Sequence, residues 1–73
     1  MFESTVDVED RAQTALADSP IYALRELQVE CEGDSLLISG RVSSFYHKQL
    51  AQEVVRSVAG SHRVVNEVNV VDS

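Results

Sequence analysis

Apolar and polar residues alternate along two stretches of the chain, residues 27–32 and 35–42. A period of two is typical of strands that bury one face. The stretches flank Gly33 and Asp34, which form a turn signal, so the pattern predicts a β-hairpin. The two apolar rows set its register, because a slip of one residue would turn one row into water.

In this register three pairs share the apolar side: Cys31 with Leu36, Val29 with Ile38, and Leu27 with Gly40. On the other side, Glu30 faces Leu37 and Gln28 faces Ser39. Gly40 interrupts the apolar row of the second strand. A glycine at such a position indicates that another part of the chain comes close, and the expected neighbour is a helix.

Two further segments follow the 3.6-residue period of amphipathic helices. The first prediction is a helix over residues 5–17, with Ser4 or Thr5 as N-cap; its apolar row is Val8, Ala12, Ala15 and Leu16. The second is a helix over residues 44–59, capped by Ser43 or Ser44 and ended by Gly60 in a left-handed cap; its apolar row is Leu50, Ala51, Val54, Val55 and Val58. Ser19-Pro20 predicts a short helical turn over Ile21 to Leu24.

The segment 64–71 alternates again and predicts a third strand. Its inward row is Val64, Asn66, Val68 and Val70, and its outward row is Val65, Glu67, Asn69 and Val71. An inward amide needs a hydrogen-bond partner. We therefore expect Asn66 at the start of the strand, bonded to backbone or solvent.

The predicted order is helix, strand, strand, helix, strand. Because strand–helix–strand crossovers are right-handed, the third strand should run parallel to the second. The expected fold is α+β, a two-layer α/β sandwich whose three-stranded mixed sheet carries both helices on one face. One domain spans residues 1–73, with 1–4 and 72–73 as frayed tails. The open face would carry Gln28, Glu30, Leu37, Ser39, Arg41, Val65, Glu67, Asn69 and Val71.

The charge is unevenly distributed along these 73 residues, whose net charge is −6. Residues 1–34 carry nine acids and two arginines, whereas residues 35–73 carry three acids and four cations. This balance argues against nucleic acid as a partner, because binding nucleic acid requires clustered cations.

The acidic start of the chain is unlike a signal peptide, and the compartment stays open: envelope or periplasm if a signal was removed, cytoplasm if Met1 is the native start. The lone Cys31 is expected to be a small buried hydrophobic residue.

A set of short matches runs along nearly the whole chain. They are Leu16-Ala-Asp-Ser-Pro, Leu27-Gln-Val29-Glu-Cys31, Gly33-Asp-Ser-Leu36-Leu-Ile38-Ser-Gly40-Arg-Val42, Leu50-Ala51 in a helix that ends at Gly60, and Val64-Val-Asn66-Glu-Val68-Asn-Val70. In order and spacing they resemble the BON domain, a family named for bacterial osmotically inducible and nodulation proteins.

The resemblance implies an α/β sandwich that acts as a non-catalytic module of bacterial envelope, osmotic-shock, secretion and channel-associated proteins. Such modules are often linked with phospholipid membranes, and others bind small ligands or ions, including potassium. The matching residues are structural: Gly33, Gly40 and Gly60 in the backbone, and Val29, Ile38, Val42, Val68 and Val70 in the core. Unlike the family pattern, only one such domain is present, and Ser61-His62-Arg63 follows Gly60 where a hydrophobic residue is usual.

Catalysis is not predicted, because no nucleophile motif frames any Ser, His or Asp. His47 and His62 lie at opposite ends of the second predicted helix, roughly 20 Å apart at 1.5 Å per residue, so they cannot share a metal. We predict no catalytic residue, no metal and no cofactor.

The first candidate surface is the second helix with its flanks. Phe45 projects onto its polar side, Tyr46 lies at the boundary, and Lys48, Arg56 and Arg63 supply positive charge. Aromatic rings beside cations suit a lipid interface. The alternative for Phe45 is that it folds over the start of the helix and closes the core.

Two other binding hypotheses remain. The open sheet face, through Leu37, Arg41, Val65 and Val71, could bind a protein partner or a second copy of the chain. The acids Asp7, Glu9, Asp10, Glu32 and Asp34 could hold a small ligand or cation, although such acids commonly serve helix dipoles and turns. The prediction is a binding module at a phospholipid membrane or other envelope component, with a protein interaction as the alternative.

Overall fold

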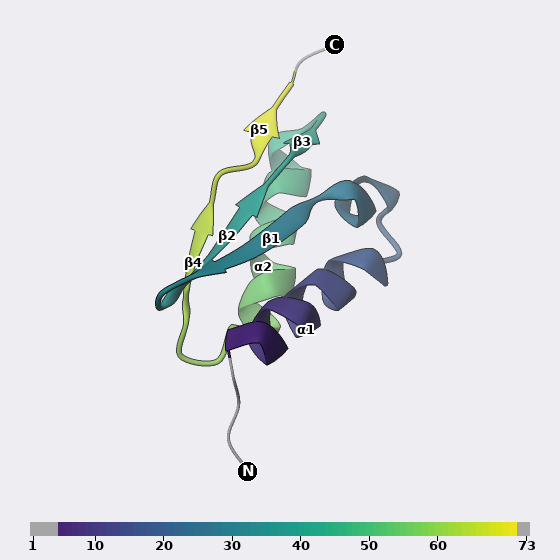
Figure 1. The fold of residues 1–73 in the computed structure, drawn as a ribbon. Coiled ribbons are helices and arrows are strands. Elements are labelled where there is room, and N and C mark those ends of the chain that lie inside the picture. The colour runs from purple at the N-terminus through teal and green to yellow at the C-terminus, as the bar shows by residue number, and fades with distance from the viewer. Residues whose placement is uncertain (1–4, 72–73) are drawn as a thin grey trace.

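The computed structural model describes residues 5–71 and has the predicted two-layer arrangement. Helix α1 (Thr5–Ala17) is followed by a short 3-10 helix, η1 (Tyr22–Glu26), and by the hairpin strands β1 (Gln28–Glu32) and β2 (Ser35–Ser39). After β3 (Arg41–Val42) come helix α2 (Phe45–Ala59) and strands β4 (Arg63–Asn66) and β5 (Asn69–Val70). Figure 1 shows α1 and α2 together on one side of the sheet.

The sheet has the predicted mixed topology. β1 and β2 are antiparallel with the expected register, in which Val29 faces Ile38 and Cys31 faces Leu36. β4 lies parallel to β2, giving the order β1-β2-β4. The predicted long strands 35–42 and 64–71 are each divided, however. Their second parts, β3 and β5, form a separate parallel pair in which Val42 faces Val70.

The core fills the space between the helices and the sheet. α1 contributes Val8, Ala12 and Leu16, and α2 contributes Ala51, Val55 and Ala59. Leu50, Val54 and Val58 pack beside them as half-buried neighbours. The remaining core residues are Leu24, Leu27, Val29, Leu36, Ile38, Val42 and Val68.

The helix caps are partly as predicted. Of the two serines before α2, Ser44 is the N-cap, since its hydroxyl accepts the N–H of His47 at 3.1 Å. Gly60 ends the helix with φ 62° and ψ −123°, so its φ is positive as expected while its ψ departs from the left-handed helical region. The N-cap of α1 stays a prediction, because the structure describes neither Ser4 nor the side chain of Thr5. Residues 1–3 and 72–73 are not described either.

Three predictions about single residues are wrong. The close neighbour of Gly40 is not a helix but Leu27, its partner in the hairpin: a Cβ at Gly40 would lie 2.7 Å from Leu27 Cδ2. Val70 is 43% exposed and is not a core residue, because β5 pairs with β3 alone and leaves one side of Val70 uncovered. Cys31 is half-buried, because it lies on an edge strand beside the turn, with Sγ 3.7 Å from the Gly33 carbonyl oxygen.

Asn66 faces inward, as predicted, but it ends β4 and does not start the strand. Its side-chain amide donates to the Lys48 carbonyl of α2 at 2.8 Å and to Gln52 Oε1 at 3.3 Å. Its Oδ1 accepts the N–H of Val68 at 3.2 Å. Asn66, the polar residue of the inward row, therefore joins β4 to α2. Its bond to Val68 spans the break between β4 and β5.

Candidate functional site

The most exposed large apolar side chains of the described residues come from three elements. Tyr22 of η1 is 71% exposed, and Phe45 and Tyr46 in the first turn of α2 are 62% and 64% exposed. Val70 of β5 and Val71, which follows it, are also exposed. In Figure 1, η1, β5 and the start of α2 lie toward the same end of the molecule, opposite the hairpin turn. We call these five residues the aromatic end.

Local sequence explains why two aromatic rings are exposed at the start of α2. Ser44 starts the helix, so the helical phase is set by its cap. In that phase the inward positions belong to small and branched residues such as Ala51 and Val55, both fully buried. Phe45 and Tyr46 consequently face away from the sheet, and Phe45 does not close the core.

A shallow apolar hollow of about 270 Å³ lies between η1, β3 and Val71 at the aromatic end. It is lined by Ala23, Glu26, Arg41, Val42, Ser43 and Val71. The strands beneath it are joined by the β3–β5 pairing, which the Val71 N–H extends with a 2.8 Å hydrogen bond to the Val42 carbonyl. This part of the surface is therefore held by backbone hydrogen bonds although it lies beyond the main sheet.

Positive charges accompany the aromatic end. Arg25 lies 5.5 Å from the Tyr22 ring centroid and donates from Nε to the Ser19 carbonyl at 2.8 Å, which holds its guanidinium near the ring. Arg41 lines the hollow, beside the acid Glu26. Lys48 lies in the first turn of α2. Three cations thus belong to the elements that meet here.

The turn acids are found at the other end of the molecule. Glu32 and Asp34 belong to the hairpin turn, and the N-terminal turn of α1 is also at this end (Figure 1). Glu9 has a structural role, since its Oε1 accepts the N–H of Cys31 at 2.8 Å. The Asp7 side chain lies outside the description. Among residues 5–71, no three His, Cys, Asp or Glu side chains converge as a metal site would require.

The five residues predicted for a membrane contact do not lie together. Phe45, Tyr46 and Lys48 share the first turn of α2. Arg56 is eleven residues after Phe45, which is roughly 16 Å along the helix at 1.5 Å per residue. Arg56 and Arg63 line a hollow of about 340 Å³ between the C-terminal half of α2 and the start of β4, and His62 is also part of its lining. The predicted set is thus divided between the two ends of α2.

The predicted sheet-face residues are divided in a similar way. Leu37 and Val65 face one another across β2 and β4, and both are half-buried on the side away from the helices. Arg41 and Val71 line the apolar hollow at the aromatic end. The open face therefore contributes one apolar pair, not a patch of four residues.

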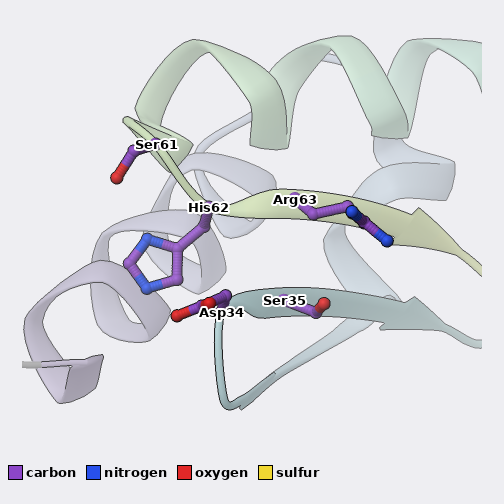
Figure 2. Close-up of a pocket in the computed structure, with 5 residues that line it drawn as sticks. All are labelled: Asp34, Ser35, Ser61, His62 and Arg63. Atoms are coloured by element: carbon purple, nitrogen blue, oxygen red, sulfur yellow. The ribbon is translucent and has the colours of Figure 1, made fainter.

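A hollow of about 560 Å³ lies between the hairpin turn and the loop after α2. Figure 2 shows its lining residues Asp34, Ser35, Ser61, His62 and Arg63 around an open polar space. The Arg63 N–H donates to the Asp34 carbonyl at 2.8 Å, and His62 Nδ1 lies 3.2 Å from the Ala59 carbonyl oxygen. His47 is at the opposite end of α2, so the two histidines are not brought together.

Comparison with known protein families agrees with this architecture. A model of the BON domain matches residues 4–72. The chain belongs to the BON domain family. BON domains are non-catalytic binding modules, so the family points to binding and not to a reaction. The chain matches none of the curated proteins with which it was compared. Within residues 5–71, no helix has the length and apolar character needed to cross a bilayer.

Sequence reasoning missed Tyr22 and Val70 of this BON domain's aromatic end, and also Arg25 beside the Tyr22 ring. Tyr22 and Arg25 belong to a helix of five residues, which is too short for a hydrophobic period to show which side chains face out. Their spacing of three residues was the available signal, because it places two side chains on one face of a helical turn. Val70 was placed inward by strand alternation and by the family resemblance, and neither shows where the strand divides.

Proposed function

We propose that this BON domain associates with phospholipid membrane surfaces end-on, through the aromatic end. The observation that carries the proposal is the exposure of Tyr22, Phe45 and Tyr46 on η1 and α2, two elements that also carry Arg25 and Lys48. Arg41 of the neighbouring β3 lines the hollow beside η1. Aromatic rings favour the boundary between headgroups and acyl chains, and nearby cations are attracted by anionic lipid. The envelope setting implied by the family resemblance remains a prediction.

The charge distribution supports an end-on orientation. An acidic domain is repelled by an anionic surface unless its acids point away from the surface. With the aromatic end toward the membrane, the hairpin turn carrying Glu32 and Asp34 lies at the far end of the molecule (Figure 1). Screening over a Debye length of about 8 Å in physiological salt then weakens the repulsion from these two acids.

The exposed areas limit how strong this association can be. At 62% and 64% exposure, Phe45 and Tyr46 each retain roughly 100–150 Å² that a membrane could cover. At about 25 cal/mol per Å², full insertion of one ring contributes at most about 4 kcal/mol. Each cation near an anionic surface adds about 1 kcal/mol. The expected association is reversible, and we expect it to need anionic lipid.

The proposal is tested by flotation with vesicles of phosphatidylcholine, with and without phosphatidylglycerol. We expect binding to the anionic vesicles that falls about tenfold or more in the variant Phe45→Ala/Tyr46→Ala, because half-insertion of the two rings together exceeds 1.4 kcal/mol. Both side chains are exposed, so the fold should be retained. Binding unchanged by this double substitution would contradict the proposal.

A matched pair of charge reversals on α2 tests the orientation. Lys48→Glu places a negative charge in the first turn beside the rings, whereas Arg56→Glu places it toward the other end of the same helix. End-on contact predicts that Lys48→Glu weakens binding and that Arg56→Glu changes it little. Equal losses in both variants would mean that α2 lies flat on the membrane, and the end-on proposal would be wrong.

A protein interaction through the open sheet face is the second candidate. It is favoured by the Leu37–Val65 pair, two apolar side chains that face one another across β2 and β4 on the uncovered side. Replacing both with serine should abolish binding to such a partner and leave vesicle binding unchanged. Loss of vesicle binding in this variant would argue against a separate role for the face.

A further inference from the structure

The three-stranded sheet has two edges, β1 and β4, and side chains of α1 occupy the first of them. Gln13 donates from its side-chain amide to the Leu27 carbonyl at 2.8 Å and accepts the Val29 N–H at 2.9 Å. Glu9 accepts the next outward N–H, that of Cys31, at 2.8 Å. These bonds use backbone groups that would otherwise pair with another strand, so the β1 edge is closed.

The β4 edge is different. Arg63 and Glu67 direct their N–H groups toward β2, where they bond the carbonyls of Asp34 and Ile38 at 2.8 Å. Because backbone direction alternates along a strand, the N–H and C=O groups of Val64 and Asn66 point the other way, out of the sheet. The Asn66 side chain is bonded to α2 and leaves these backbone groups uncovered. Figure 1 shows β4 at the outer side of the sheet, and no strand formed by residues 5–71 pairs with it on that side.

We propose that a second copy of this chain pairs with this edge, β4 against β4 in antiparallel orientation, joining two three-stranded sheets into one. In a two-fold pairing centred on Val65, Val64 and Asn66 of one copy exchange hydrogen bonds with Asn66 and Val64 of the other. Val65 then faces Val65 of the second copy. The side chains of Arg63 and Glu67, both exposed, face Glu67 and Arg63.

The side chains select this register over its neighbours. Shifting the centre to Val64 would place Arg63 opposite Val65, and shifting it to Asn66 would place Val65 opposite Glu67. Only the pairing centred on Val65 sets both charges against opposite charges and the apolar residue against itself. Cross-strand pairs of these kinds stabilise antiparallel sheets, whereas like charges in facing positions destabilise them. The edge is therefore complementary to a copy of itself, as a two-fold interface requires.

This interface is independent of the proposed membrane contact. It uses the β4 edge and none of the residues of the aromatic end, and it shares only Val65 with the Leu37–Val65 pair of the open face. An antiparallel arrangement directs the two aromatic ends away from each other. Because the pairing is short, the dimer is weak and should form at high protein concentration.

Charge exchange tests the register. In analytical ultracentrifugation over a concentration series, Arg63→Glu and Glu67→Arg should each weaken self-association about tenfold or more, since each sets two like-charged pairs face to face. An equimolar mixture of the two variants should associate again, because every facing pair is then of opposite charge. The double variant Arg63→Glu/Glu67→Arg should associate like the wild type. Circular dichroism verifies that each variant is folded.

A second variant tests the edge without changing charge. Val64→Pro removes an N–H that points away from β2, so the internal ladder is kept while the pairing loses hydrogen bonds. We expect this variant to be folded and monomeric. A wild-type chain that is monomeric at about 1 mM, or charge variants that fail to associate when mixed, would overturn the proposal.

Discussion

Replacing Gly40 with alanine should destabilise the fold far more than the same change at Gly33, although both glycines have positive φ. Gly40 has φ +131°, and a Cβ there would lie 2.7 Å from Leu27 Cδ2. Gly33 has φ +60°, and a Cβ there would meet nothing within 4 Å. Both substitutions strain a backbone with positive φ, and only Gly40→Ala adds a collision with a neighbouring side chain.

The magnitudes follow from these surroundings. At Gly33 the left-handed conformation costs alanine about 1–2 kcal/mol, offset by up to about 1 kcal/mol because alanine restricts the unfolded chain. At Gly40 the backbone strain is about 1–3 kcal/mol. Displacing Leu27, which is 1% exposed and has no free space, adds about 1–3 kcal/mol. We expect a loss of about 3 kcal/mol for Gly40→Ala and about 1 kcal/mol for Gly33→Ala.

Urea unfolding followed by circular dichroism measures both free energies. A domain of this size is stable by about 4–11 kcal/mol, so both variants should remain measurable. Leu27→Val removes Cδ2 and should recover part of the Gly40→Ala loss, which would appear as non-additivity in a double-mutant cycle. Equal losses for the two alanine variants, or strict additivity with Leu27→Val, would refute this account of Gly40.

Three further substitutions test contacts that hold the elements together. Asn66→Ala removes three hydrogen bonds between β4, α2 and the following chain, and should cost about 1–3 kcal/mol in urea unfolding. Gln13→Ala should cost about 1–2 kcal/mol and speed amide hydrogen exchange at Val29, whose N–H loses its acceptor. Ser44→Ala should lower the free energy of unfolding by about 1 kcal/mol, whereas Ser43→Ala should leave it nearly unchanged.

Each of these three predictions can fail in its own way. An Asn66→Ala variant as stable as the wild type would mean that the inward amide has no role in joining β4 to α2. Unchanged exchange at Val29 in Gln13→Ala would show that the β1 edge is not closed by this side chain. Equal effects at Ser43 and Ser44 would leave the N-cap of α2 unassigned.

The hairpin and the helices could be predicted because several residues constrain each of them at once. Two apolar rows agree on one register for β1 and β2, and a capping serine and a terminal glycine bracket α2. The breaks after β2 and β4 could not be predicted. Valines at 64, 65, 68, 70 and 71 suit a strand in either phase, so nothing in the pattern indicates where the long strand divides.

The candidate site was less predictable, because exposure depends on neighbours that are distant in sequence. Helical phase placed Phe45 on the polar side of α2, but whether its ring folds back depends on what lies beside the helix start. That neighbour proved to be the β3–β5 pair, which follows the breaks at Gly40 and at Glu67 and Val68. The closed β1 edge also depends on contacts between residues 14 to 22 positions apart.

The two proposed surfaces together determine what a dimer could do at a membrane. Antiparallel pairing through β4 directs the two aromatic ends apart, so a dimer cannot place both on one flat bilayer. It can, however, present one aromatic end to each of two membranes.

If both proposals hold, the wild-type chain should cluster anionic vesicles at concentrations that support the dimer. Arg63→Glu should still bind those vesicles, because Phe45, Tyr46 and Lys48 are unchanged, but it should not cluster them. If Arg63→Glu still clustered vesicles, clustering would not depend on the β4 edge, and another contact between the chains would have to cause it.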